Sequence, residues 1–363
     1  MLRLILTSQR KRSISAQKTG GFTLIELLVA MVLAALVLTP LLGFMVNILE
    51  TDRREQAKAN TEQEIQAALD YIAQDLQQAV YIYDADGIDA IKTQLPDSGA
   101  TDRVPVLVFW KRELQKHIVP ATNSNCSDPK TKTCDDTFVY SLVAYYLIKD
   151  NEPTWSKSAR IGRFEIQDGI RSANGTARTE PVYSYDGNTN TITQNGTQQV
   201  KYLGSPSDPG KKGWPDRGFM PFNLTFSGDL TKKMGLWRKH NSEPYAVTKP
   251  LTLVDYIDQT KFTTTATAGL KPAPICRKKI IDNPDGTKTQ VDIKTVPEQS
   301  ATPQELQTGS FYACVDSSTT TAQVFIRGNA LARIRDGATW SDKSTYFPTS
   351  SIQVQGRGFL YTK

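Results

Sequence analysis

Four cysteines are the residues of this 363-residue chain best suited to covalent or metal chemistry: Cys126, Cys134, Cys276 and Cys314. An even number of cysteines suits disulfides in an oxidising compartment. Local pairing, Cys126 with Cys134 and Cys276 with Cys314, is the simplest of three connectivities, and free buried thiols are the alternative. A zinc site is disfavoured, because no C-x-x-C spacing exists and only His117 and His240 could add ligands. The cysteines therefore predict two disulfides and no metal centre.

Three acidic residues, Asp84, Asp86 and Asp89, are close enough in sequence to offer oxygen ligands to Ca²⁺. A solvated turn at a helix end is the simpler interpretation of the same cluster. Catalytic patterns are missing: neither histidine has a nucleophile context, and no G-x-S-x-G or H-E-x-x-H motif exists. We expect no enzyme activity and no cofactor.

Glu26 is an acidic residue near the start of an apolar stretch that runs from Phe22 to Leu49. An ionised carboxylate in a lipid-facing helix costs roughly 2.5–3.5 kcal/mol or more, so Glu26 should have a partner. One partner is local, because Thr23-x-x-Glu26 fits the capping box, in which the glutamate reaches back to the backbone at the helix start. As a helix the stretch is roughly 40 Å long, which is enough to cross a bilayer with tilt.

The charge distribution predicts the orientation of this helix. The chain has a net charge of +6. Five basic residues and no acidic residue precede the stretch, so the rest of the chain has a net charge close to zero. The residues before the helix should therefore stay cytoplasmic, and the C-terminal body should be exported. Only one stretch of the sequence has the length of a bilayer, which excludes a polytopic membrane protein. Hydrophobic residues make up 39% of the chain and charged residues 22%, a composition that excludes a disordered chain. A cleaved secretory signal or an uncleaved signal anchor are alternatives for the stretch itself.

The run Gly21-Phe22-Thr23-Leu24-Ile25-Glu26 closely resembles the signal of prepilins, the precursors of type IV pilins and pseudopilins. The resemblance implies cleavage between Gly21 and Phe22 by prepilin peptidase, followed by N-methylation of Phe22. It also implies that Glu26 neutralises the new amine of a neighbouring subunit in the filament core. Under this interpretation residues 1–21 are the leader, 22–49 the transmembrane half of a spine helix, 50–80 its amphipathic half, and 81–363 a β-rich head.

The patterns beyond the apolar stretch predict an α+β, pilin-like fold. Ile65, Leu69, Ile72, Leu76 and Val80 recur at helical spacing, so the spine should run to about Val80, with a kink at Pro40. Asn283-Pro284-Asp285-Gly286 predicts a hairpin turn. Residues 186–222 and 296–309 are expected to be long loops. β-Branched and aromatic runs predict antiparallel strands at 104–110, 138–148, 160–166, 251–257, 311–315, 322–327 and 351–354.

The large body resembles minor pilins and J-type pseudopilins and, more narrowly, the pseudopilins of cyanobacterial hormogonium polysaccharide secretion. That resemblance implies a single-pass inner-membrane precursor with a periplasmic head, which later joins a pilus or pseudopilus at the cell surface and supports polysaccharide secretion and motility. Its partners would be prepilin peptidase, other pilins, the assembly platform, the inner membrane and the exported polysaccharide.

A pilus-tip adhesin or DNA-capture subunit is the alternative function. It would use basic and aromatic residues that could touch phosphate or sugar: Lys211, Lys212, Trp214, Arg217, Lys232, Lys233, Arg238 and Lys239. The nearly neutral charge of the body argues against nucleic acid as a partner.

Overall fold

The computed structural model describes residues 21–120, 126, 134–206, 213–262, 274–283, 285–298, 302–340, 345–358 and 360. The chain divides into two compact units at Arg53 and Arg54. The first unit holds the apolar part of one long helix. The second holds the rest of that helix and the strands of the described residues.

Helix α1 (Leu24–Gln77) changes character along its length. Its side chains are exposed as far as Gln56, whereas Ala57, Ile65, Leu69, Ile72 and other residues of one face are buried further on. Pro40 lies inside the helix without ending it. The helix ends at Gln77 rather than near Val80, because Val80 belongs to strand β1 (Ala79–Ile82), which pairs with β2. Here pairing between strands outweighs the helical spacing of Val80.

A five-stranded antiparallel sheet with the order β1-β2-β3-β4-β7 is the main element of the head. Its centre is apolar, and Val108, Phe109, Leu142 and Val143 are fully buried. The predicted strands of this region are confirmed, with longer bounds for three of them. The strands after β1 are β2 (Arg103–Pro120), β3 (Cys134–Ile148), β4 (Ala159–Gln167) and β7 (Leu251–Ile257).

A four-stranded antiparallel sheet, β10-β11-β12-β13, lies next to the first one. The two sheets meet where Ile257 of β7 bridges Gly328, which follows β12. Gly328 also lies against α1: a Cβ there would be 2.5 Å from Thr61 Cγ2 and 2.6 Å from Ile65 Cδ1. The strands are β10 (Thr295–Val296), β11 (Phe311–Asp316), β12 (Thr321–Arg327) and β13 (Thr349–Gln355).

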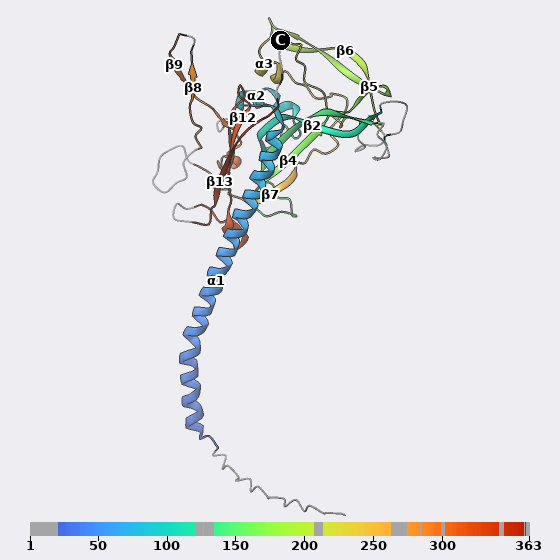
Figure 1. Cartoon of the computed structure of the whole chain (residues 1–363). Coiled ribbons are helices and arrows are strands. Elements are labelled where there is room, and N and C mark those ends of the chain that lie inside the picture. Colours follow the sequence, from blue (N-terminus) through green and yellow to red (C-terminus); the bar gives the residue numbers. More distant parts are fainter. Residues whose placement is uncertain are drawn as a thin grey trace, which may run out of the picture. The chain divides into compact units, whose positions relative to one another are not determined.

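Two separate hairpins extend from these sheets (Figure 1). One is the predicted hairpin, with β8 (Lys279–Asp282) and β9 (Lys288–Val291) around the Asn283 turn. The other pairs β5 (Arg171–Asp186) with β6 (Thr191–Tyr202). The expected loop at 186–222 is therefore wrong over β6. That strand is mostly exposed and rich in Thr, Gln and Asn, so it lacks the apolar alternation that marks a half-buried strand.

The described part of the second unit also contains short helices. They are α2 (Ala85–Ile91), α3 (Leu230–Gly235) and the 3₁₀ turns Lys92–Gln94, Gln304–Leu306 and Ala330–Arg333. The expected loop at 296–309 holds one of these turns and the end of β10.

Candidate functional site

The start of α1 forms a capping box around Thr23 and Glu26. The N–H and the hydroxyl of Thr23 donate to Glu26 Oε2 at 3.4 and 3.3 Å, and the N–H of Glu26 donates to Thr23 Oγ1 at 3.3 Å. Each residue thus satisfies a backbone group that the first helical turn leaves without an intrahelical partner. The cap leaves the carboxylate at the surface of the chain, beside Gly21 and Phe22.

The apolar segment that begins at Phe22, just before the cap, is exposed along its whole length. Phe22 is 82% exposed, and Leu33, Leu36 and Phe44 are each more than half exposed. Among the described residues, α1 is the one helix long and apolar enough to cross a membrane. An exposed apolar surface of this extent needs a lipid or protein partner, which suits a membrane-anchored subunit.

A buried ion cluster joins the second half of α1 to the sheet. Asp75 of α1 accepts hydrogen bonds from Arg163 Nε of β4 at 2.7 Å and from the Tyr145 hydroxyl of β3 at 2.7 Å. Lys111 Nζ of β2 lies 3.3 Å from Asp75 and 2.7 Å from Glu165. Burial by itself raises the pKa of Asp75, but Arg163 and Lys111 outweigh it and hold that pKa below its usual range. The cluster is therefore ionised and aligns α1 with three strands.

Both local cysteine pairs lie at disulfide distance. The Cα atoms of Cys126 and Cys134 are 5.9 Å apart and those of Cys276 and Cys314 are 5.6 Å apart, and both pairs are bonded. Cys134 begins β3 and Cys314 lies in β11. The second bond ties the segment leading into the β8–β9 hairpin to the four-stranded sheet.

The proposed calcium ligands do not meet. Asp84 caps α2 by accepting from Gly87 N at 2.8 Å, while Asp86 pairs with Lys294 at 2.7 Å and Asp89 with Lys92 at 2.8 Å. Within the described ranges, no cluster of three His, Cys, Asp or Glu residues could hold a metal ion. The three carboxylates act as a cap and as surface ion pairs, since they point to different partners.

The described basic residues of the alternative function differ in their surroundings. Lys232 lies 5.3 Å from the ring centre of Tyr185, and Lys239 lies 5.0 Å from that of Tyr245. Lys233 is buried, and Lys211 and Lys212 lie outside the described residues. Two of the described lysines of this set therefore pack on different aromatic rings, and a third is buried.

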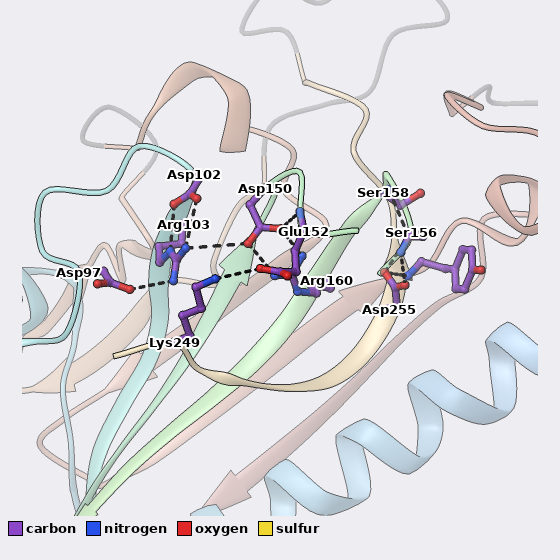
Figure 2. A network of polar contacts seen from close by, with 11 residues as sticks. Asp97, Asp102, Arg103, Asp150, Glu152, Ser156, Ser158, Arg160, Lys249 and Asp255 are labelled. Carbon is purple, nitrogen blue, oxygen red and sulfur yellow. Dashed lines mark hydrogen bonds and ion pairs between the residues drawn. The ribbon is translucent and has the colours of Figure 1, made fainter. Parts of the chain in front are cut away.

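A polar network that the sequence did not predict includes Arg103 of β2 and Arg160 of β4 in the five-stranded sheet (Figure 2). Arg103 Nη1 is 2.8 Å from Asp97 Oδ2, and its Nε is 2.9 Å from Asp102 Oδ1. Arg160 binds both oxygens of Asp150, at 2.5 and 2.6 Å. The hydrogen bond that Arg160 donates to Asp150 lowers the pKa of Asp150. The hydrogen bond that Arg103 donates to Asp102 raises the pKa of Arg103.

This network positions the loop between β3 and β4. Ser156 donates to Asp255 of β7 through its N–H at 2.8 Å and its hydroxyl at 2.7 Å, and Lys249 binds Glu152 at 2.9 Å (Figure 2). Trp155 lies between these anchors in sequence and is 39% exposed. No short motif links these residues, which come from separate segments, so their assembly depends on strand order.

Comparison with known proteins identifies one family model. Residues 17–42 match the prokaryotic N-terminal methylation motif. No curated protein and no solved structure gives a significant match. The matched region contains the predicted cleavage point, the Thr23–Glu26 cap and the start of the apolar helix. With its methylation motif, its long apolar N-terminal helix and its antiparallel β-rich head, the chain is a type IV pilin-like protein.

Proposed function

We propose that the chain is a minor pilin or pseudopilin, a structural subunit that prepilin peptidase cleaves between Gly21 and Phe22 and that then enters a type IV pilus-like or type II secretion-like filament. The observation that carries the proposal is the match of residues 17–42 to the methylation motif on an exposed apolar helix. In the filament, Glu26 pairs with the methylated amine of Phe22 on a neighbouring subunit. Because this pair is buried, a subunit whose charge finds no partner is strongly destabilised. The pair therefore selects the axial register of neighbouring subunits.

The same proposal covers topology and biological role. The precursor spans the inner membrane once, with its N-terminus in the cytoplasm and its head in the periplasm. The filament supports polysaccharide secretion and motility, as the resemblance to hormogonium pseudopilins suggests. Deletion of the chain should lower both exported polysaccharide and gliding, and normal export from the deletion strain would contradict this role.

Two substitutions in the capping box test the assembly role of Glu26. Glu26→Gln keeps an oxygen that can accept from Thr23 but removes the charge, whereas Thr23→Ala removes the reciprocal cap and keeps the charge. Glu26→Gln should be cleaved normally yet be depleted from sheared filaments on an immunoblot. Thr23→Ala should enter filaments. If Glu26→Gln enters filaments like the wild type, the carboxylate has only its capping role.

Cleavage is tested separately. Gly21→Ala should leave the leader attached, and the precursor should then keep its higher apparent mass on a gel. Normal maturation of this variant would contradict the cleavage site.

A further inference from the structure

The β8–β9 hairpin is a two-stranded sheet of its own, paired with no other strand of the described residues (Figure 1). It carries exposed apolar side chains: Ile280 is 58% exposed, and Ile281 and Val291 are each at least 40% exposed. A two-stranded ribbon is marginally stable in water, and three or more strands with an apolar face are more stable. A further strand along one edge would therefore stabilise the hairpin.

The base of the hairpin is fixed to the four-stranded sheet. The disulfide between Cys276 and Cys314 precedes β8, and Lys279 Nζ lies 2.6 Å from Asp316 Oδ2 of β11. These contacts leave Ile280 and the residues after it in β8 exposed. A partner that binds β8 thus meets a strand whose position is already restricted, which lowers the entropy lost on association.

The ladder within the hairpin decides which backbone groups of β8 point outward. Asn283 N donates to Thr287 O at 2.8 Å, which marks a hydrogen-bonded pair next to the pair Asp282–Lys288. Hydrogen-bonded and non-hydrogen-bonded pairs alternate in antiparallel ladders. The N–H and C=O groups of Asp282 and Ile280 therefore point away from β9. Among the described residues, these groups have no hydrogen-bond partner.

The side chains along this edge match a second copy of the same edge. Lys278, Ile280 and Asp282 occupy alternate positions, so they share one face of the hairpin. A second β8 strand can add antiparallel about a two-fold axis at Ile280. Each Ile280 then lies opposite Ile280 of the second copy and exchanges both backbone hydrogen bonds with it. Each Lys278 lies opposite Asp282 of the second copy.

These cross-strand pairs are favourable in type. Apolar pairs and pairs of opposite charge both stabilise neighbouring antiparallel strands. Lys278 and Asp282 have ion partners within the hairpin, Asp292 and Lys288, at 3.1 Å in both cases. Both side chains are nevertheless more than half exposed, so each can take a second partner of opposite charge.

The outer edge of β9 is a poorer match. Its outward positions are Lys288, Gln290 and Asp292, which have the same order of charges. The central residue is Gln290, however, so a second copy added there would bury no apolar side chain at the axis. The apolar centre between two charges distinguishes the β8 edge.

We propose that two copies of the chain associate through their β8 edges, which form a continuous antiparallel sheet in the order β9-β8-β8-β9. A two-fold contact is closed, whereas a filament grows through open-ended contacts. The β8 contact therefore joins heads in pairs and goes beyond the proposed function. It can fail while the filament role stands.

Cysteine cross-linking of the full-length chain in membranes tests the proposal. Residues that form a hydrogen-bonded antiparallel pair have Cα atoms about 5.5 Å apart, which suits a disulfide. The four native cysteines are already bonded in pairs. Under mild oxidation, Ile280→Cys should give a dimer on a non-reducing gel. Gln290→Cys, on the exposed β9 edge, is the control and should give about tenfold less dimer.

Charge variants in the Ile280→Cys background test the register. Asp282→Lys places lysine opposite Lys278 of the second copy, and Lys278→Asp places aspartate opposite Asp282. Each variant alone should therefore cross-link about tenfold less than its parent. When the two variants carry different tags and are mixed, each lysine again faces an aspartate, so the mixed dimer should return to the parental yield. This rescue also shows that both variants are folded.

Three results would overturn the proposal. The first is equal cross-linking of Ile280→Cys and Gln290→Cys, or no cross-linking of either. The second is an unchanged yield in the two charge variants, which would assign the association to another surface such as α1. The third is the absence of the mixed dimer when the two charge variants are combined.

Discussion

Asp75 of α1 and Arg163 of β4 are joined by a hydrogen bond of 2.7 Å between Arg163 Nε and Asp75 Oδ2, across 88 residues of sequence. Asp75 is 7% exposed, and Lys111 and Tyr145 contact the same carboxylate. The spine of the head is therefore fixed to its sheet by charge as well as by apolar packing.

Asp75→Asn should destabilise the head by about 3 kcal/mol, because it leaves two buried cations without part of their counter-charge. The free energy of unfolding, measured by urea denaturation, checks this prediction. Asp70→Asn is the matched control, since Asp70 lies on the exposed face of the same helix. An equal effect of both variants would contradict a special role for the buried cluster.

The pH dependence of this cluster follows from the lowered pKa of Asp75. A carboxyl whose pKa is lower in the folded state stabilises the fold above its unfolded pKa of about 3.9. That stabilisation should be lost as the pH falls through the folded pKa. Wild type should therefore lose more stability below about pH 4 than Asp75→Asn does.

The contribution of Asp168 to stability should change with pH in the direction opposite to that of Asp75. Burial raises the pKa of Asp168 to about 6, partly offset by Arg171 and by the N–H of Gly169. The folded state then binds a proton more tightly than the unfolded state, so stability should fall as the pH rises from about 4 to about 6. Asp168→Asn should remove this fall and stabilise the head at neutral pH by about 1–2 kcal/mol, allowing for partial exposure. Unfolding free energies at several pH values would show it, and an unchanged pH profile would contradict it.

The two disulfides should differ in what their removal costs. The bonded residues are 38 positions apart for Cys276–Cys314 and 8 apart for Cys126–Cys134. In the chain-entropy account, closing these loops stabilises the folded state by about 4 kcal/mol for Cys276–Cys314 and about 2.5 kcal/mol for Cys126–Cys134. Replacing each pair by serine and comparing urea midpoints checks the order. A larger loss for the Cys126–Cys134 variant would contradict it.

Gly328→Ala should separate α1 from the four-stranded sheet. The added Cβ would overlap Thr61 and Ile65, so α1 or the strand end must shift, at a cost of about 1–3 kcal/mol. Gly99→Ala is the control, because a Cβ there has open space around it. A melting temperature for Gly328→Ala equal to that of the control would mean that α1 adjusts without cost.

Much of the fold follows from local sequence. The Thr23–Glu26 cap, the helical stripe from Ile65 to Leu76 and the Asn283 turn each depend on residues within a few positions of one another. Helical and strand periodicity are local properties, so they predicted α1 and seven of the strands. Prediction failed at Val80, where pairing of β1 with β2 outweighed the helical spacing, and over β6, whose residues have no distinctive pattern and pair with β5.

The sequence by itself determined the prepilin-like signal, the apolar helix and the general α+β architecture, because each depends on spacing within one segment. Only the tertiary structure decided that Asp75 meets Lys111 and Arg163, and that Asp255 of β7 holds Ser156 of the β3–β4 loop. These contacts depend on which strands are neighbours and in what register. Strand order and register come from packing of the whole head, and a shift of one residue would turn the same side chains to the other face.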